Sequence, residues 1–334
     1  MKISLLIASC DDDYSEQLSG YLSDRYKDAF YISVCRSSQN LRELLAVSGF
    51  DAALLEQPLA SGIDLSPVRL PVMLWDESVS GTDVQPEGLT IRKYQRISSI
   101  AAYILENYAK ISVGEFDPGT GRAYITAVWS PAGGVGKTTV AVAQALKLSA
   151  EGKKVVYLNL EHFSSSPAYF DDDGRSISSV FEMLEKNTGN LKMLIQAIIR
   201  QDADSGIMYF RGPENYDDIN ILSEEDTSAL LTACAGAAEG LVVDLPGSCD
   251  VRTRQVFKLA DRILLVTDQS GASETKLRQF VCQHSVYEQF KSKAVLVANR
   301  GSAYPEPLLP EMISLPLVQS SDPAAVSRAL AGCI

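Results

Sequence analysis

Apolar and polar residues alternate along residues 1–110 in the manner of short strands separated by helices. The apolar runs predict strands at 3–8, 31–34, 51–56, 70–75 and 89–94. Helical spacing of apolar residues predicts intervening helices at 14–26, 41–47 and 97–109. Five short strands with helices between them are typical of a small doubly wound α/β domain.

The later part of the chain has uninterrupted runs of Val, Leu and Ile. They predict strands at 124–130, 153–160, 241–245, 262–268 and 294–300. A helix is expected at 138–152, where Gly152 marks the C-terminal stop. Strands that are apolar at every position are typical of a parallel sheet covered on both faces, so we predict a second, mostly parallel α/β domain.

Residues 111–122, ISVGEFDPGTGR, combine Gly, Pro and Asp and interrupt both patterns. We therefore predict a domain at 1–110, a linker at 111–122 and a second domain at 123–334. A length of 334 residues suits two domains that each bury a core of their own.

Charge and cysteine usage narrow the class of protein. The net charge is −12, with 10 basic and 15 acidic side chains in residues 1–110 and 20 and 27 in the remainder. This balance argues against specific or nonspecific nucleic-acid binding, which needs clustered Lys and Arg. Six cysteines without a CxxC pair and only two histidines argue against a zinc site and favour reduced thiols in a cytoplasmic protein.

Three observations bear on membranes. No apolar stretch reaches the length needed to span a bilayer. The first apolar run is brief and leads into three aspartates, so we expect a buried strand there and not a signal peptide. The C-terminal segment PAAVSRALAGCI lacks a basic face and a bulky apolar stripe, so direct membrane insertion is not expected.

The predicted strand at 124–130 runs into PAGGVGKTT and then into the predicted helix. Glycines in such a turn let successive N–H groups point at a polyphosphate, and the helix directs its positive end at the same anion. The predicted nucleotide-binding residues are Gly133, Gly134, Val135, Gly136, Lys137, Thr138 and Thr139. Lys137 is expected at the β- and γ-phosphates and Thr138 at Mg²⁺. The usual motif has Gly in place of Pro131, which leaves an ordinary glycine-rich turn as the alternative.

The segment WSPAGGVGKTTVAVAQALKLSAEGKKVVYLNLE resembles the deviant Walker A loop and second strand of the MinD/ParA ATPases. LVVDLPG (241–247) resembles their Walker B strand, and LVANR (296–300) resembles their base-recognition strand. SPAGGVGKTTVA, YLNLE and VVDLP also resemble the TadZ/CpaE family of pilus-assembly proteins, which carry a receiver-like domain before the ATPase. The resemblance implies ATP and Mg²⁺ as cofactors, a homodimer around ATP, and pilus or secretion assembly proteins as partners.

The resemblance also implies roles for single residues. Asp244 matches the Walker B aspartate, which binds Mg²⁺ through water, so Thr138 and Asp244 are the predicted metal-binding residues. Glu161 takes the place of the switch I aspartate, and Asn159 that of an upstream Asp. The predicted catalytic residues are Lys137, Glu161 and Asp244.

Two further positions affect the predicted chemistry. Asn299 and Arg300 resemble residues that frame the adenine, although a buried Asn that caps the strand end is an open alternative. The family's signature lysine falls at Ala132, so stabilisation of charge from the partner subunit is missing. We therefore expect ATP binding with slow hydrolysis.

By the same resemblance the domain at 1–110 is receiver-like, with a flavodoxin-like fold. Receivers accept phosphate on an Asp at the third strand, where this chain has Glu56, and Lys93 matches their fifth-strand lysine. The acidic pair is either Ser9 and Cys10 or, in a looser alignment, part of Asp11–Asp13. Glu56 and Lys93 are expected to form an ion pair or to be two solvated charges. We predict docking and not phosphorelay.

The predicted function is a dimeric, ATP-binding organiser that localises or assembles a tight-adherence-type pilus or secretion machine, concentrated at a cell pole or assembly site. One alternative is a scaffold that ignores nucleotide, which Pro131 and Ala132 favour. The other is a metabolic P-loop enzyme on the same fold, such as a carboxylate-activating synthetase, but the sequence has no distinctive substrate motif.

Overall fold

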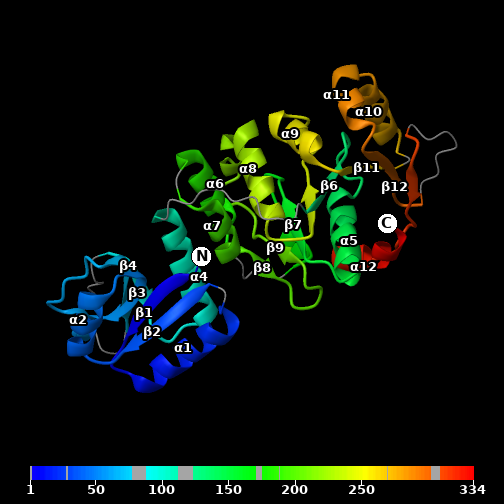
Figure 1. Ribbon diagram of the computed structural model, residues 1–334. Helices are drawn as coiled ribbons and strands as arrows, with labels where there is room; N and C mark the ends of the chain where they lie inside the picture. The colour runs from blue at the N-terminus through cyan, green and yellow to red at the C-terminus, as the bar shows by residue number, and fades with distance from the viewer. Residues whose placement is uncertain are drawn as a thin grey trace. The chain divides into compact units, whose positions relative to one another are not determined.

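The computed structural model describes residues 2–27, 29–76, 88–111, 123–170, 175–187, 189–268, 270–301 and 309–334. The chain divides into two compact units, Met1–Ser112 and Val113–Ile334 (Figure 1). Helix α4 ends at Ile111, and the rest of the predicted linker lies outside the described residues. Among the described residues, no helix has the length and apolar character needed to cross a bilayer.

In the first unit, the described residues form a five-stranded, all-parallel sheet of order β2-β1-β3-β4-β5. Its strands are β1 (Ile3–Ala8), β2 (Phe30–Cys35), β3 (Phe50–Glu56), β4 (Val68–Trp75) and β5 (Thr90–Arg92). Its helices are α1 (Asp12–Arg25), α2 (Ser38–Val47), α3 (Gln57–Ala60) and α4 (Ile97–Ile111). This strand order is the flavodoxin-like one, in which the topological switch point lies between β1 and β3.

In the second unit, the described residues form an eight-stranded sheet of order β13-β12-β11-β6-β10-β7-β9-β8, parallel except for the β8–β9 pair. Its strands are β6 (Tyr124–Trp129), β7 (Val155–Asn159), β8 (Arg200–Gln201), β9 (Met208–Tyr209), β10 (Gly240–Asp244), β11 (Arg262–Thr267), β12 (Ala294–Ala298) and β13 (Met312–Ser314). Its helices are α5 (Lys137–Ala150), α6 (Ser178–Lys186), α7 (Leu191–Ile198), α8 (Glu224–Ala235), α9 (Val251–Leu259), α10 (Gly271–Val281), α11 (His284–Phe290) and α12 (Pro323–Leu330). Short 3₁₀ helices lie at η1 (Ser166–Ala168), η2 (Asp218–Ile221) and η3 (Ala331–Cys333).

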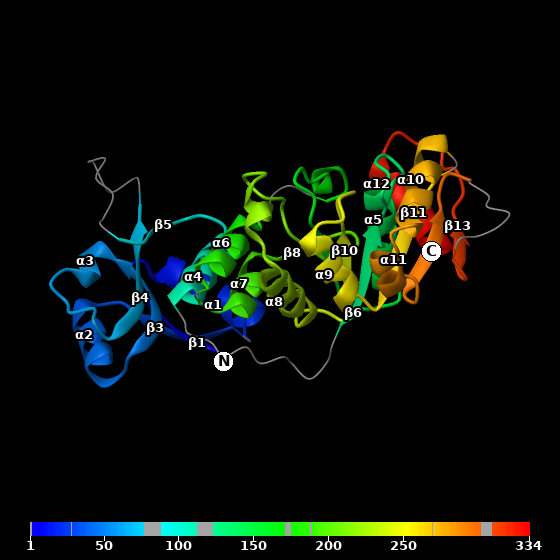
Figure 2. The ribbon, with the colours of Figure 1, turned by 90° about the horizontal axis from the view of Figure 1, so that it is seen from above.

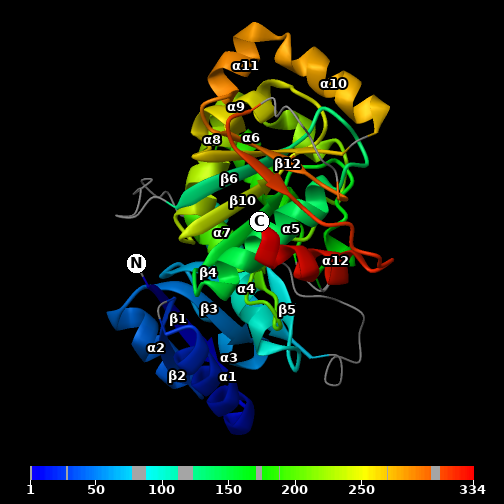
Figure 3. The ribbon, with the colours of Figure 1, turned by 90° about the vertical axis from the view of Figure 1, so that its right-hand side faces the viewer.

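Helices lie on both sides of the sheet that contains β6 (Figure 2). Val128 lies in the apolar cluster that includes α5 and α12. Trp129 points the other way and contacts Phe257 of α9, Phe280 of α10 and Phe290 of α11 edge to face. Figure 3 shows α9, α10 and α11 on one side of strands β6, β10 and β12. Because both faces are covered, the central strands consist mainly of buried apolar residues, as the sequence predicts.

The mixed α/β fold with a mostly parallel sheet is confirmed, and the predicted strands match the observed ones to within about two or three residues. In the second unit, strand β10 pairs with β6 on one side and with β7 on the other. The carboxyl ends of these three parallel strands therefore lie side by side, and they lead into the glycine-rich turn, Glu161 and Asp244.

Candidate nucleotide-binding site

The glycine-rich turn connects β6 to α5. Gly134 and Gly136 have φ angles of +77° and +91°, a left-handed conformation that favours glycine. Gly136 is the N-cap of α5, and a Cβ there would lie 2.6 Å from Nδ2 of Asn299. The turn therefore requires glycine at 136 both for its backbone conformation and for its contact with Asn299.

Lys137 begins α5 and is the buried cation of this site, with 8% of the residue exposed. Its Nζ lies 3.7 Å from Oε1 of Glu161, just beyond the end of β7. The unpaired N–H groups of the first turn of α5 add a partial positive charge at the same place. An anion at the turn would therefore meet both the lysine and the helix end.

Asp244 is the last residue of β10, and none of its surface is exposed. Its Oδ2 accepts hydrogen bonds from the hydroxyl of Tyr157 at 2.9 Å and from Nδ2 of Asn159 at 3.1 Å. Among the described residues, no hydrogen bond reaches its Oδ1. A buried carboxylate oxygen without a partner is costly, so this atom suits a ligand that the polypeptide does not supply.

Burial and, to a lesser degree, the negative charge of Glu161 raise the pKa of Asp244 to about 7. The Thr138 and Tyr157 hydroxyls and the Lys137 ammonium lower this pKa in part. Two carboxylates therefore share one lysine, and the site carries an excess of negative charge. The donor set of two carboxylates and a hydroxyl fits Mg²⁺, which prefers oxygen ligands.

The end of β12 is tied to the glycine-rich turn. Asn299 is 5% exposed; its Nδ2 donates to the Val135 carbonyl at 2.8 Å, and its Oδ1 accepts from the N–H of Arg300 at 2.9 Å. The guanidinium of Arg300 donates to the Gly134 carbonyl at 2.7 Å and pairs with Asp268 at 3.3 Å. Both side chains thus brace the back of the turn, and the polar groups of Asn299 are already engaged there.

A cavity of about 220 Å³ opens beside the first turn of α5. One wall includes Gly136, Thr139, Asn299 and Arg300, and the other comes from residues 316–330. Thr139 is held in place because its hydroxyl lies 2.9 Å from that of Tyr169. A molecule with its phosphates at the turn could extend into this cavity.

A family model described as "ParA: NUBPL iron-transfer P-loop NTPase" matches residues 122–289, half of the chain. The chain belongs to this ParA family of P-loop NTPases. It is 25% identical over 214 residues to the septum site-determining protein MinD of Helicobacter pylori, which covers 59% of this chain and 76% of that protein. The superfamily that the sequence predicts is therefore confirmed.

Comparison with solved structures supports the fold of this ParA-family unit in one case. A ParA family ATPase from Chlorobium tepidum superposes with a TM-score of 0.52 at 17% identity, covering 63% of this chain and 91% of that one. MinD of Pyrococcus horikoshii, solved in complex with Mg-ADP, superposes with a TM-score of 0.47 at 16% identity, covering 63% and 94%.

In this ParA-family unit the structure brings Lys137, Glu161 and Asp244 together, as the sequence predicts. Asn299 and Arg300 instead donate hydrogen bonds to the Val135 and Gly134 carbonyls of the turn. Ala132, where the family has its signature lysine, is only 3% exposed and lies in the apolar core.

Sequence reasoning missed three polar residues of the site. Tyr157 contacts Asp244, Tyr169 contacts Thr139, and Asp268 contacts Arg300. The one local signal was the tyrosine in the otherwise aliphatic run VVYL, because a hydroxyl in a fully buried strand needs a partner.

The first unit carries a second charged cluster, outside the ParA-family match. Oε1 of Glu56 lies 2.6 Å from Nζ of Lys93 and accepts the Ser9 hydroxyl at 2.5 Å, while Oε2 accepts the Cys10 N–H at 2.8 Å. The Glu56 and Lys93 side chains are 12% and 8% exposed, so they form an ion pair and are not solvated charges. Lys93 also lies 3.3 Å from Asp11. The structure thus engages Ser9, Cys10 and Asp11 together.

Proposed function

We propose that this chain binds ATP with Mg²⁺ and acts as a dimeric, slowly hydrolysing organiser of a tight-adherence-type pilus or secretion machine. Membership of the ParA family supports the nucleotide-binding part. The pilus part rests on the resemblance of SPAGGVGKTTVA, YLNLE and VVDLP to TadZ/CpaE proteins. We place its action in the cytoplasm, at a cell pole or assembly site, without membrane insertion and without a specific nucleic acid.

The observation that carries the nucleotide-binding proposal is the unpartnered Oδ1 of the buried Asp244. In this proposal Thr138 and Asp244 hold Mg²⁺, Asp244 through water, and the metal neutralises charge on bound phosphates. The N–H groups of residues 133–139 and the Lys137 ammonium bind those phosphates. Asn299 and Arg300 shape the wall of the adjoining cavity and frame the adenine.

Two residues support slow hydrolysis. Ala132 supplies no charge at the place of the signature lysine, and its burial keeps it out of contact with a substrate. Glu161 is the carboxylate available to orient a water molecule, but it lies 3.7 Å from Lys137 and shares its charge. Efficient in-line attack requires a closely positioned nucleophile, so this arrangement favours a long-lived ATP state.

The first unit is proposed to be receiver-like and to serve for docking. Its strand order is that of flavodoxin-like folds, and Glu56 takes the place of the phosphate-accepting aspartate. Because Glu56 already accepts from Lys93, Ser9 and the Cys10 N–H, it has no free role as an acceptor of phosphate.

Calorimetric titration with ATP·Mg²⁺, with mass followed by light scattering, tests the proposal on wild type and Lys137→Ala. We expect wild type to bind and to dimerise more tightly with ATP, and Lys137→Ala to do neither. No binding by wild type, or the same dimer with and without ATP, would support the second candidate, a scaffold that ignores nucleotide. Ala132 and Pro131 are the observations that favour this second candidate.

A further inference from the structure

Two large aromatic side chains are exposed near the candidate nucleotide site. Phe163 is 80% exposed and Tyr216 is 53% exposed, yet their rings stack on each other with centroids 5.9 Å apart and planes 20° apart. Aromatic rings left in water, fixed in one geometry, are typical of residues that anchor a protein–protein contact. We call Phe163 and Tyr216 the aromatic platform.

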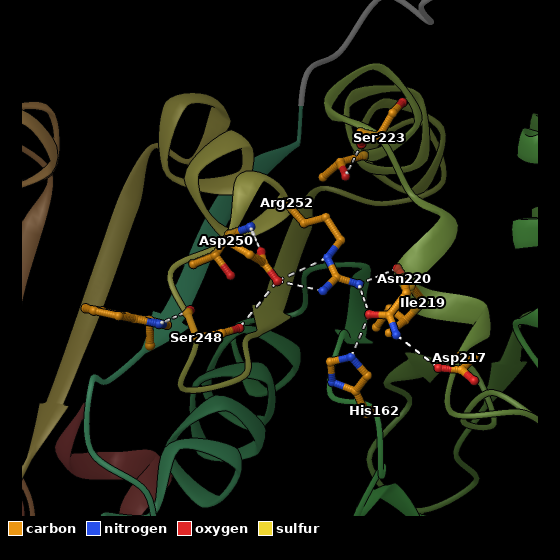
Figure 4. Close-up of polar contacts among 11 residues, drawn as sticks. His162, Asp217, Ile219, Asn220, Ser223, Ser248, Asp250 and Arg252 are labelled. Atoms are coloured by element: carbon orange, nitrogen blue, oxygen red, sulfur yellow. Dashed lines mark hydrogen bonds and ion pairs between the residues drawn. The ribbon is translucent and has the colours of Figure 1, made fainter.

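A polar network holds the segments that carry the platform (Figure 4). Arg252 pairs with Asp250 at 2.6 Å and donates to the Ile219 carbonyl and, at 3.3 Å, to Oδ1 of Asn220. Oδ1 of Asn220 also lies 2.9 Å from Nε2 of His162, which must be the donor. Three segments distant in sequence are therefore joined, and the rings are positioned before any partner binds.

The network starts at the ends of two strands of the candidate site. His162 and Phe163 follow Glu161 directly after β7, and Asp250 lies in the segment that follows β10 and Asp244. Groups bound beside Glu161 and Asp244 therefore act on the same backbone segments that hold the aromatic platform.

The charge around the platform is negative. Residues 211–226 contain six acidic side chains and one basic one, and Glu214, Asp217 and Glu225 are exposed. Two of the three cations of α9, Arg252 and Lys258, are paired with Asp250 and Glu224, and the third, Arg254, is exposed. A second copy of this face would bring like charges together, whereas a cationic segment would be attracted both by the carboxylates and by the faces of the rings.

We propose that the aromatic platform is a docking site for a basic segment of a partner protein, one that places lysine or arginine over the rings and an apolar side chain beside them. That this partner belongs to an assembled machine rests on the proposed function, whereas the docking itself does not. Any dependence of docking on ATP would arise from the segments that begin at Glu161 and Asp244.

The test uses the full chain and three labelled helical peptides, followed by fluorescence anisotropy at physiological salt. One peptide combines lysine and leucine, the second glutamate and leucine, and the third lysine and serine. We expect binding of the lysine–leucine peptide only, weakened at least about tenfold by Phe163→Ala with Tyr216→Ala. Tyr124→Ala, an exposed tyrosine at the start of β6, is the matched control and should bind as wild type does.

Two further variants separate charge from ring contact. Phe163→Leu keeps apolar area but loses the ring face and should weaken binding by a few-fold. Glu214→Gln with Asp217→Asn should weaken binding and reduce its salt dependence. Circular dichroism of each variant checks that the fold is intact.

Three outcomes would overturn the proposal: binding of the glutamate–leucine peptide, equal binding of the lysine–serine peptide, or a Tyr124→Ala effect as large as that of the double variant. A loss of dimer mass in the double variant, without peptide binding by wild type, would assign the platform to self-association instead. Repeating the peptide titration in the presence of ATP·Mg²⁺ distinguishes the docking proposal from the proposed function. If the chain binds the peptide but not ATP, only the proposed function is refuted.

Discussion

Each unit of the chain places a lysine beside a glutamate at the carboxyl edge of a parallel sheet, and the two pairs differ in completeness. In the first unit Nζ of Lys93 lies 2.6 Å from Glu56, and both Glu56 oxygens accept further hydrogen bonds. In the second unit Nζ of Lys137 lies 3.7 Å from Glu161. Asp244, close to both, is buried, and no described residue donates a hydrogen bond to its Oδ1.

The difference indicates which cluster is structural and which awaits a ligand. A cluster whose charges and hydrogen bonds are satisfied internally gains nothing from an added ion. A cluster with surplus negative charge and an unpaired buried oxygen gains from a cation. The first unit therefore satisfies its charges with an internal ion pair, whereas the second leaves a buried carboxylate oxygen without a hydrogen bond, where we propose that a ligand binds.

The largest effect that would test this contrast concerns Asp244 and pH. Its folded-state pKa of about 7 exceeds the ordinary value of 3.8, so folding binds the proton more tightly. The stability that this proton contributes is complete below about pH 4 and is lost as the pH rises to about 7, by up to about 4 kcal/mol. Asp244→Asn, whose amide oxygen can still accept from Tyr157 and Asn159, should therefore be the more stable protein at pH 8 and no more stable at pH 4.

Urea unfolding without nucleotide at both pH values measures this difference. With ATP·Mg²⁺ bound, wild type should instead be the more stable of the two proteins at pH 8. If the free energies of unfolding of wild type and Asp244→Asn depend on pH in the same way between pH 4 and 8, the pKa of Asp244 is not raised. The contrast between the two clusters would then be wrong.

Glu56→Gln should destabilise the first unit by about 3 kcal/mol, because it leaves the buried ammonium of Lys93 with only Asp11 as a charged partner. Although burial raises it, hydrogen bonds from Lys93, Ser9 and the Cys10 N–H keep the pKa of Glu56 below its ordinary value. The stability from Glu56 is therefore present above about pH 4.5 and is lost as the pH falls, the opposite sign to Asp244.

Hydrogen exchange of β3 against β10 in the full chain localises this loss of stability to the first unit. Asp12→Asn is the matched control, since its ion pair with Arg36 is exposed and should contribute less than about 0.5 kcal/mol. Equal exchange of β3 in Glu56→Gln and wild type would show that the first cluster is not a structural ion pair.

Lys137→Ala should weaken ATP·Mg²⁺ binding at least about a hundredfold, which corresponds to about 2.7 kcal/mol. Lys93→Ala is its counterpart in the first unit and should leave nucleotide affinity unchanged while lowering the stability of that unit. Calorimetry measures both affinities. If both variants lose the same amount of ATP·Mg²⁺ affinity, the two clusters do not differ in ligand binding as we infer.

Gly136→Ala and Gly62→Ala compare a glycine of the second unit with one of the first. Both glycines have positive φ, +91° and +72°, but a Cβ meets Nδ2 of Asn299 at 2.6 Å at position 136 and nothing within 4 Å at position 62. We expect Gly136→Ala to cost about 2 kcal/mol and Gly62→Ala about 1 kcal/mol of unfolding free energy. If urea unfolding gives the same loss of unfolding free energy for both variants, the close contact of position 136 with Asn299 does not contribute to stability.

The strands and the turn could be read from the sequence because their signals are local. An apolar run such as LVVDL and the spacing of glycines before Lys137 both act within a few residues. The segment 166–235 received no predicted elements, although Ser223 and Asp226 form a capping box at the start of α8. Helices α6 and α7, with 9 and 8 residues, and the two-residue strands β8 and β9 are shorter than the window in which periodicity is informative, whereas α8, with 12 residues, was simply missed.

By itself, then, the sequence determined two parallel α/β units, a glycine-rich turn with Lys137 and Thr138, and the presence of Asp244 at a strand end. Only the tertiary structure decided that Tyr157 and Asn159 occupy one oxygen of Asp244, that Glu56 neutralises Lys93, and that Arg252 joins two distant segments. The physical reason is that these contacts depend on strand order and register, which bring together side chains 33 to 87 positions apart. A local sequence pattern therefore does not predict which donors reach a buried carboxylate oxygen such as those of Asp244.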